Sequence, residues 1–548
     1  MKPETVRGFF VDVQEALETK TSHYLGTLVL AQTGTMFEIV DGQQRLSTIM
    51  LMVHGLLAQL ATSDPVRIAD EIYLLNQGSD TKLDFGTNRE FVADLFSAHN
   101  PTPNTGGQRR LAEAYRHCFE RAQAIHQNAG DSGIHTWLDT VKNLEIIAFT
   151  ESDTGRAIRM FQSVNDRGRP LTAMDKAKAL LVLYSNRFLN GKLDDRINQA
   201  FGTCFSAYDR MREQASQSGY KIELISRTTF TEDDLLRYHY LSYDASEASD
   251  YYGYSQTVLD DFLKPALKTR QGNTMALHEF ISDYVEDLEA FAQAFAGLVD
   301  ATRSDTRMFT LLVVHSLAAR LYPITIRLYQ RGLLFEQLSN ATPAVDLLHC
   351  LEVVDLRVYK LRGTDPAKDI GHLSHKSRKA TVDEIAASLR TFVMAFMPNG
   401  LMETQLGQWM YKNGATVPIL FALGQFQPYT LQKLVTLIQD VPTQEHILSQ
   451  EPSFDCTAYG FDDSTEFEDY LNRIGNLTLL TAAENTRCQN KSVKRKMSQQ
   501  DLYPSSKFVG TRRLANQFTV SGAVFDKNAV IARIQELKHF ALTRWAIW

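Results

Sequence analysis

The stretch FEIVDGQQRLSTIMLMVHGLLAQL, residues Phe37–Leu60, reads as a short apolar strand that passes through a glycine turn into a long apolar helix. Apolar residues recur at helical spacing from Leu46 onward, a periodicity typical of a packed helix. A strand, a tight turn and a helix expose free backbone N–H groups at the helix start, where the helix dipole adds partial positive charge. The stretch therefore predicts an α/β unit with an anion site at the turn.

The side chains of the turn suit a phosphate ligand. Gly42 would let the backbone approach an anion closely, and Arg45 could contact phosphate oxygens through two N–H groups. Gln43 and Gln44 can donate to phosphate, and Asp41 could hold Mg²⁺ or a ribose hydroxyl, or anchor the arginine. The alternative is a structural helix cap, in which Asp41 accepts from the first-turn amides. The spacing alone favours that alternative, because short motifs match by accident.

The whole chain has the composition of a globular protein. Its 548 residues predict two to four domains, and its apolar content of 44% can bury real cores. The net charge of −7 does not indicate nucleic-acid binding, although it can hide a local basic face. No signal peptide or membrane span is predicted, and five scattered cysteines without a CxxC pair indicate a reduced cytoplasm.

The coarse pattern along the chain predicts three domains. Strands are expected at Leu25–Leu30, Phe37–Val40 and Leu144–Phe149, with a helix at Arg156–Ser163. The chain from about residue 185 to 440 is mostly helical in pattern. We predict an α/β domain over 1–185, a helical middle domain over 186–395 and a third domain over 396–548.

An acid beside a histidine marks a second candidate site near the C-terminus. Glu445 and His446 end a predicted strand, and neighbours on a strand face opposite ways. Glu445 could thus bind a metal while His446 stays free as a general base. A second strand carrying Asn476 would pair back, and the helix after it would bring Asn485 towards the acid. Carboxylate, amide and water oxygens suit Mg²⁺ or Mn²⁺, and the set suits phosphodiester hydrolysis. The alternative is a packed histidine and a turn-forming asparagine.

A basic segment follows this site. Between Arg487 and Arg513 the sequence has eight lysines and arginines against the single acid Asp501. On an acidic chain this predicts a local positive face that grips the DNA backbone, the alternative being a solvated charge run. The candidate DNA contacts are Asn490, Lys491, Lys494, Arg495 and Lys496.

The N-terminal motifs resemble a known family. YLGTLVL followed by FEIVDGQQRLSTI resembles the N-terminal domain of GmrSD-type restriction proteins, whose fold is similar to ParB and sulfiredoxin. The resemblance implies that DGQQR belongs to a nucleoside-triphosphate site, for ATP, GTP, CTP or UTP. FQSVNDRGRPLTAMDKAKALL, residues 161–181, resembles a second element of that family. The resemblance adds Asn165, Arg167, Gly168 and Lys178 to the nucleotide site.

Two observations qualify the second element. Asp175 also matches the family pattern, but Thr172 and Asp175 have the spacing of a helix cap, so that role is as well supported as a ligand contact. Proteins of the family usually carry a segment with tyrosine, glutamine and arginine before the first helix, and the sequence from Met1 does not show it. The resemblance therefore implies nucleotide binding more firmly than hydrolysis.

The C-terminal motifs resemble the HNH, or ββα-metal, nuclease motif in the version that closes GmrSD-type proteins. The matching segments are EHIL, NRIGNLTLL and the EN dipeptide at 484–485. The resemblance implies that Glu445 and Asn485 are metal ligands, His446 is the general base and Asn476 braces the loop between the strands. Asn490 or Lys491 is expected to contact the scissile phosphate.

These patterns predict an α+β multidomain protein: a ParB/sulfiredoxin-like α/β domain, a mainly helical middle and an HNH nuclease within a helical domain. The function implied is a cytoplasmic, Mg²⁺-dependent endonuclease of bacterial anti-phage restriction, coupled to nucleotide binding or hydrolysis and directed at modified phage DNA. The first alternative is a nucleotide-dependent DNA-binding sensor with an inactive nuclease domain. The second is an NTPase switch acting on a protein partner. The sequence leaves open whether the chain forms a homodimer.

Overall fold

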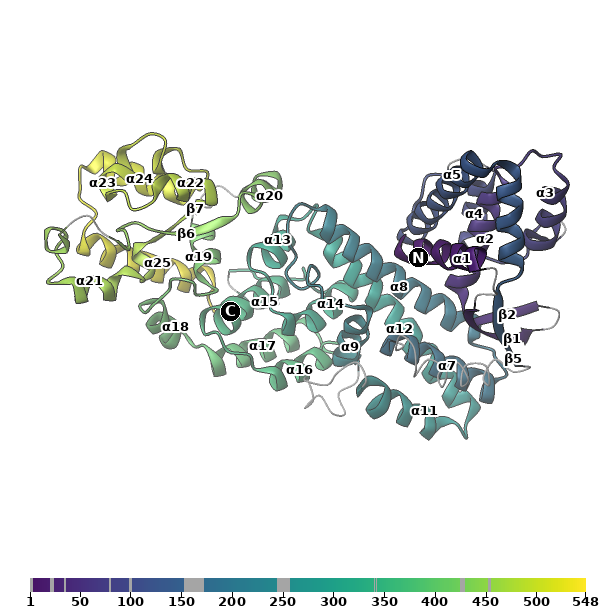
Figure 1. The fold of residues 1–548 in the computed structure, drawn as a ribbon. Coiled ribbons are helices and arrows are strands. Elements are labelled where there is room, and N and C mark those ends of the chain that lie inside the picture. The colour runs from purple at the N-terminus through teal and green to yellow at the C-terminus, as the bar shows by residue number, and fades with distance from the viewer. Residues whose placement is uncertain are drawn as a thin grey trace. The chain divides into compact units, whose positions relative to one another are not determined.

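The computed structural model describes residues 3–19, 24–33, 36–77, 80–97, 101–151, 172–243, 257–339, 341, 343–423, 429–451 and 455–548. The fold is α+β, mostly helical with small sheets (Figure 1). The chain divides into two compact units. The first comprises residues 1–202 and 263–285, and the second comprises residues 203–262 and 286–548.

The first unit contains a three-stranded sheet. Strand β1 (Tyr24–Thr33) lies between β2 (Met36–Asp41) and β5 (Glu145–Glu151). β1 is antiparallel to β2 and parallel to β5. The three strands expected in this region all form, with slightly different ends. The helix expected at Arg156–Ser163 lies outside the described residues.

Helices beside this sheet build the core of the first unit. Helix α2 (Gln43–Leu57) packs against the long α5 (Gly106–Lys142), as does α1 (Pro3–Thr19) (Figure 1). A Cβ at Gly55 would lie 3.3 Å from the backbone of Cys118, so this glycine permits the close approach of α2 and α5. The unit also contains α3 (Pro65–Asp70), η1 (Glu71–Leu75), β3 (Asn76–Gln77), β4 (Asp80–Thr81), η2 (Gly86–Asn88), α4 (Arg89–Phe96), α7 (Ala173–Leu189) and α11 (Lys264–Arg270).

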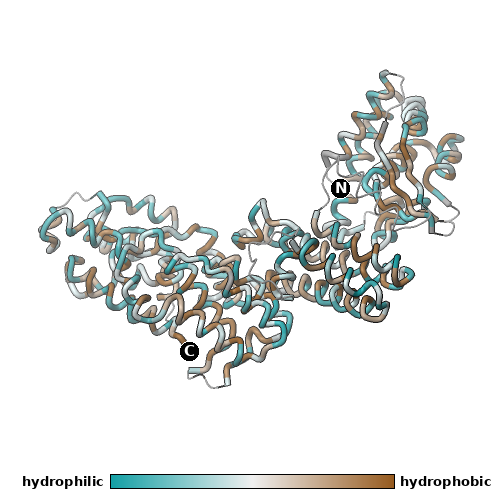
Figure 2. Tube along the Cα trace, turned by 90° about the horizontal axis from the view of Figure 1, so that it is seen from below, coloured by the Kyte–Doolittle hydropathy of each residue, from teal (hydrophilic) through white to brown (hydrophobic). Residues whose placement is uncertain are grey.

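The second unit begins with packed helices. Figure 2 shows apolar and polar residues alternating along them, as expected for helices that bury one side. Two long helices, α8 (Asp194–Gln217) and α12 (Thr274–Ala301), include the residues at which the chain passes from one unit to the other. The others are α9 (Glu232–Tyr243), α13 (Thr306–Phe309), α14 (Tyr322–Gln330), α15 (Leu347–Val354), α16 (Ala367–Lys376), α17 (Val382–Phe396), α18 (Asn399–Leu406), α19 (Thr416–Leu423) and α20 (Leu431–Gln439).

The C-terminal part of the second unit holds an antiparallel hairpin followed by a helix. Its strands are β6 (Pro442–His446) and β7 (Leu477–Thr481), and α22 (Ala482–Cys488) follows at once. The strand expected to carry Asn476 therefore starts after this residue, which belongs to a tight helical turn at Ile474–Asn476. Helices α19 and α24 (Val509–Ser521) pack against the hairpin, and α21 (Ser464–Leu471), α23 (Val493–Ser498) and α25 (Lys527–Arg544) complete this part of the unit.

Two features of α25 hold the start of β7 in place. A Cβ at Gly475 would lie 2.3 Å from the carbonyl oxygen of Val530, so only glycine fits beneath this helix. The buried Arg533 donates to the carbonyl oxygens of Gly475 and Leu477 at 2.8 and 2.6 Å. Within the described ranges, no helix combines the length and apolar character that a membrane span requires.

Candidate functional sites

The glycine turn of the first unit leaves the start of α2 without a side-chain cap. Gly42 has φ +98°, and a Cβ there would lie 2.1 Å from Cδ2 of Leu28, so the turn requires glycine. Gly42 is also the N-cap residue of α2, and no side chain caps this helix. The structure does not show the alternative in which Asp41 accepts from the first-turn amides. The N–H groups at the start of α2 are thus not used by a side-chain cap.

Arg45 lies across the turn. It donates through Nη1 to the carbonyl oxygen of Thr27 on β1, and the same nitrogen lies 4.0 Å from the carboxylate of Asp41. The side chain of Arg45 is 41% exposed. Gln43 donates to the carbonyl oxygen of Ile39 at 2.8 Å, and both glutamines of the motif are exposed. The motif therefore presents polar groups at the surface, with its arginine held in place from one side.

Of the second nucleotide-binding element, only the C-terminal part can be placed. Asn165, Arg167 and Gly168 lie outside the described residues. Lys178 on α7 is partly buried, and burial lowers its pKa, against the raising effects of the Asp175 and Glu38 carboxylates. Because Glu38 belongs to β2, the strand that leads into DGQQR, Lys178 lies within electrostatic reach of the first motif.

Asp175 takes part in the cap that the sequence suggested as an alternative. Its backbone N–H donates to Oγ1 of Thr172 at 3.1 Å, and that hydroxyl donates to the Asp175 carboxylate at 2.8 Å. The Thr172 hydroxyl and the Asp175 carboxylate therefore cap the N-terminus of α7. Nothing in their geometry requires a ligand.

In the second unit, the β6–β7 hairpin and α22 form the ββα order expected for the nuclease motif. On β6, Glu445 lies opposite Thr478 and His446 lies opposite Leu477. Asn485 on α22 donates to Oγ1 of Thr443 at 2.9 Å. Because Thr443 stands two residues before Glu445, both side chains project from one face of the strand. Glu445 and Asn485 thus belong to the same face of the hairpin.

The carboxylate of Glu445 is anchored through one oxygen. Glu445 is 6% exposed, and its Oε1 lies 2.7 Å from Nζ of Lys496 and 3.1 Å from the hydroxyl of Tyr503. Burial raises the pKa of Glu445, and Lys496 and Tyr503 oppose that shift. No described residue donates a hydrogen bond to Oε2. One oxygen is therefore fixed, and the other remains available to a ligand.

Lys496 is placed differently from the DNA contact expected of it. Its side chain is 1% exposed, and Nζ also donates to the carbonyl oxygen of His446 at 2.8 Å and to Oγ of Ser449 at 3.1 Å. In this structure Lys496 is a buried counter-ion of Glu445, away from the basic surface. Its place in the sequence showed a positive charge but not the direction in which the charge points.

His446 is held in one orientation. Its Nε2 lies 3.0 Å from Oδ1 of Asn472, an atom that can only accept, so Nε2 carries the proton and Nδ1 is the basic nitrogen. The ring of Tyr411 lies 4.5 Å from the imidazole, centroid to centroid. Burial lowers the pKa of His446, the Asn472 hydrogen bond opposes this and the Lys496 charge adds to it. The net lowering of its pKa favours the neutral imidazole, the form that a general base requires.

Asn476 connects the segments at the two inner ends of the hairpin. Its Oδ1 accepts from the backbone N–H of Leu448 at 2.8 Å, and its Nδ2 donates to the carbonyl oxygens of Leu448 and Leu471 at 3.1 and 2.9 Å. All of these partners are backbone groups. The contacts are those of a residue that positions the end of β6, where His446 stands.

The other candidate DNA contacts lie at or near the surface. Asn490 and Arg495 are exposed and bond to Glu451 and Gln499 at 3.3 and 2.5 Å. Lys494 is exposed, and the partly exposed Lys491 donates to the carbonyl oxygen of Arg487. These four residues can meet a ligand from solvent.

Sequence reasoning missed two partners of the site, Asn472 and Tyr503. Asn472 stands in NRIGN, four residues before Asn476, so a polar residue near the strand was a usable signal. Tyr503 lies 58 residues after Glu445, and no local pattern links the two. Only the tertiary fold brings them together.

The donor groups fit a hard divalent cation. The described residues contain no cluster of three or more histidines, cysteines and acids that could hold a metal. One carboxylate oxygen of Glu445 and the amide oxygen of Asn485 are nevertheless the kind of ligand that Mg²⁺ takes in small number, because it keeps several waters. These two residues could hold the ion with water and substrate oxygens.

Comparison with known protein families gives two matches. The family described as "GmrSD restriction endonuclease, N-terminal domain" matches residues 2–182, and "GmrSD restriction endonucleases, C-terminal domain" matches residues 420–539. A search of curated proteins gives no match. The two matched regions contain the two sites described above, in the order of this architecture. The chain belongs to the GmrSD-type restriction endonucleases, a family whose substrate is DNA.

Proposed function

We propose that the chain cuts DNA by Mg²⁺-dependent phosphodiester hydrolysis at the β6–β7–α22 hairpin, as an HNH-type site. The observation that supports this proposal is the placement of Glu445 and Asn485 on one face of the hairpin, with a neutral, oriented imidazole next to the acid. Mn²⁺ would serve as well, because both ions prefer oxygen ligands.

In the proposed reaction, Nδ1 of His446 takes a proton from a water molecule as the water oxygen attacks phosphorus. The phosphodiester P–O bond breaks, and the leaving oxygen takes a proton from solvent. Glu445 and Asn485 would hold the ion, which supplies stabilisation of the negative charge that develops on the phosphate. Asn472 fixes the imidazole and Asn476 positions the strand end, so neither touches the reacting atoms.

We also propose that the first unit binds a nucleoside triphosphate at the DGQQR turn. The start of α2 lacks a side-chain cap, and the partly exposed Arg45 stands beside it, with Lys178 in electrostatic reach of the adjoining strand. Backbone N–H groups, a guanidinium and an ammonium suit the phosphates of a nucleotide. By family analogy, nucleotide binding would be coupled to attack on modified phage DNA.

One observation favours a second candidate, a nucleotide-dependent DNA-binding sensor with an inactive nuclease domain. Lys496 lies 2.7 Å from the carboxylate that the proposed ion would use. If that ion pair excludes a metal, the chain would bind DNA without cutting it. The same contact leaves Oε2 of Glu445 without a described donor, which is why cleavage remains our conclusion.

The test is to incubate the purified chain with plasmid DNA and with modified phage DNA, with and without Mg²⁺ and each nucleoside triphosphate. Our proposal predicts cleavage of a DNA substrate that stops when EDTA removes the ion. Nucleotide-dependent DNA binding with no cleavage under any condition would support the sensor instead.

A further inference from the structure

A pocket of about 440 Å³ opens in the second unit, between the end of α16 and the start of α17. It lies outside both regions matched by the family and is separate from the two sites described above. Three of its six lining residues are lysine or arginine. The lining residues are His375, Lys376, Arg378, Lys379, Ala380 and Glu384.

The single acid of the lining is already used within its helix. Oε2 of Glu384 accepts from the backbone N–H of Thr381 at 2.8 Å and from the hydroxyl of Thr381 at 3.0 Å, as the capping box of α17. Lys376 lies within electrostatic reach of this carboxylate, but no carboxylate among the described residues lies within ion-pair distance of Lys376, Arg378 or Lys379. Lys376 instead donates to Oγ of Ser388 at 3.0 Å. The pocket therefore carries net positive charge.

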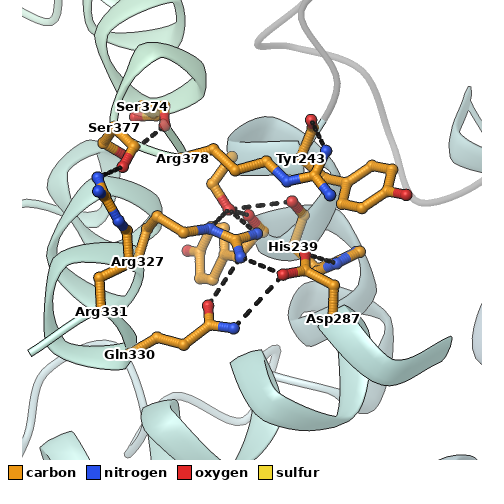
Figure 3. Close-up of polar contacts among 11 residues, drawn as sticks. His239, Tyr243, Asp287, Arg327, Gln330, Arg331, Ser374, Ser377 and Arg378 are labelled. Carbon is orange, nitrogen blue, oxygen red and sulfur yellow. Dashed lines mark hydrogen bonds and ion pairs between the residues drawn. The ribbon is translucent and has the colours of Figure 1, made fainter. Parts of the chain in front are cut away.

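The side chain of Arg378, the arginine of the pocket, is oriented by contacts with Tyr243. Figure 3 shows the guanidinium of Arg378 lying along the ring of Tyr243, with its carbon 4.0 Å from the ring centroid. Arg378 also donates weakly to the carbonyl oxygen of Tyr243, at 3.5 Å. Stacking on an aromatic face leaves the edge of a guanidinium free to donate hydrogen bonds. The cation is thus oriented before any ligand arrives.

The turn between α16 and α17, which carries the basic residues, is held by hydrogen bonds from Arg331. Arg331 donates to the carbonyl oxygen of Ser377 at 2.8 Å (Figure 3). It also donates to the carbonyl oxygen of Ala380 at 2.7 Å. Deeper in the unit, the buried Arg327 is neutralised by Asp287, with Nη1 and Oδ1 2.7 Å apart. The charge of Arg327 is therefore balanced internally, and the excess positive charge lies on the pocket residues, of which Lys376 and Lys379 are exposed.

We propose that this pocket binds a phosphate of the DNA backbone, as a second DNA contact away from the nuclease hairpin. The proposal rests on the proposed function in that it takes DNA as the substrate. A phosphodiester presents oxygens that accept from lysine and arginine, and such contacts give affinity without reading sequence. Two exposed lysines beside a preoriented arginine suit a ligand that extends past the pocket, as a polymer backbone does and a single small anion does not.

The test measures binding of a short fluorescein-labelled duplex to the full chain by fluorescence anisotropy, in EDTA and over a range of NaCl concentrations. The variant is Lys376→Gln/Lys379→Gln. Its matched control, Arg303→Gln/Arg390→Gln, removes the same charge at exposed positions of the same unit outside the pocket. We expect the lysine variant to bind about fivefold more weakly than the control, with a salt slope shallower by about 0.9 for each lost phosphate contact. Lys376→Arg/Lys379→Arg should restore binding.

Several results would overturn the proposal. One is equal affinity and equal salt slope in the lysine variant and the control. Another is a variant that keeps its DNA affinity but loses binding of ATP or inorganic phosphate, which would assign the pocket to a small anion. If the chain cuts DNA and the lysine variant binds DNA as tightly as the control, the pocket proposal is rejected and the nuclease proposal is supported. One result would instead support the pocket and reject the nuclease: weaker DNA binding by the lysine variant than by the control, in a chain that cuts no DNA.

Discussion

The two family-matched ends of the molecule build their sites in opposite ways. At the DGQQR turn, backbone geometry supplies the binding groups, and the key side chain, Arg45, is 41% exposed. At the hairpin, Glu445 and His446 are each 6% exposed, and each is held by a polar side chain, Lys496 for the acid and Asn472 for the imidazole. At an exposed site built on backbone groups, the loss of one side-chain contact leaves the other contacts in place. In a buried hydrogen-bond network, the loss of one side chain also displaces its partners. Single substitutions should therefore have larger effects at the hairpin.

The largest expected effect follows from removing the imidazole. His446→Ala should slow DNA cleavage about a thousandfold, within the range that a general base contributes, while DNA affinity stays unchanged. The measurement is a single-turnover cleavage rate paired with anisotropy. His539→Ala, at an exposed position on α25, is the control and should cut normally. Wild-type cleavage by the His446 variant would end its assignment as the base.

The buried ion pair should give the next largest effect. Lys496→Met leaves the Glu445 carboxylate buried with Tyr503 as its remaining anchor, which should lower the free energy of unfolding by about 3 kcal/mol. Chemical denaturation measures this change. Lys494→Met, at an exposed position on the same helix, should change stability little. Equal stability of the two variants would show that the ion pair does not hold the hairpin.

At the other end, the backbone itself is the most sensitive point. Gly42→Ala places a methyl group 2.1 Å from Leu28 in a backbone with φ +98°, and should destabilise the first unit by about 2 kcal/mol. Thermal unfolding with and without nucleotide measures the loss. Gly42→Ala/Leu28→Ala removes the clash but keeps the unfavourable φ. If Gly42→Ala were as stable as wild type, the conformation described for the turn at Gly42 would be contradicted.

The smallest effect is expected from the exposed arginine. Arg45→Ala should weaken nucleoside-triphosphate binding about tenfold, the loss of one hydrogen bond to a charged group. Isothermal calorimetry gives the affinity, and Arg116→Ala on α5, also exposed, is the control. Unchanged affinity in the Arg45 variant would make DGQQR a structural turn only.

The sequence predicted local geometry well where a pattern repeats or a glycine punctuates it. The strands beside DGQQR followed from apolar runs, and the turn followed from Gly42. The start of β7 was placed too early, because tertiary bonds from Arg533 and the Asn476 side chain hold Ile474–Asn476 in a helical turn. Such bonds join segments distant in sequence, and no local pattern reports them.

The sequence shows which residues are charged but not whether each side chain points to solvent or to the interior. The site prediction for the basic segment lacked this information. Lys494, Arg495 and Lys496 are consecutive basic residues on α23, yet the first two are exposed and the third is buried against Glu445. The six-residue helix turns about 100° per residue, so neighbours face different surroundings. The partners Tyr503 and Asn472 become visible only once the fold places them.

Binding of Mn²⁺, followed by electron paramagnetic resonance, tests most directly whether Glu445 and Asn485 hold an ion beside His446. The wild-type chain should bind the ion without DNA present, and Glu445→Gln and Asn485→Ala should each weaken binding at least about tenfold. His446→Ala should bind Mn²⁺ as the wild type does, because the imidazole is not a ligand. Equal Mn²⁺ affinity in all four proteins would contradict the proposed metal site.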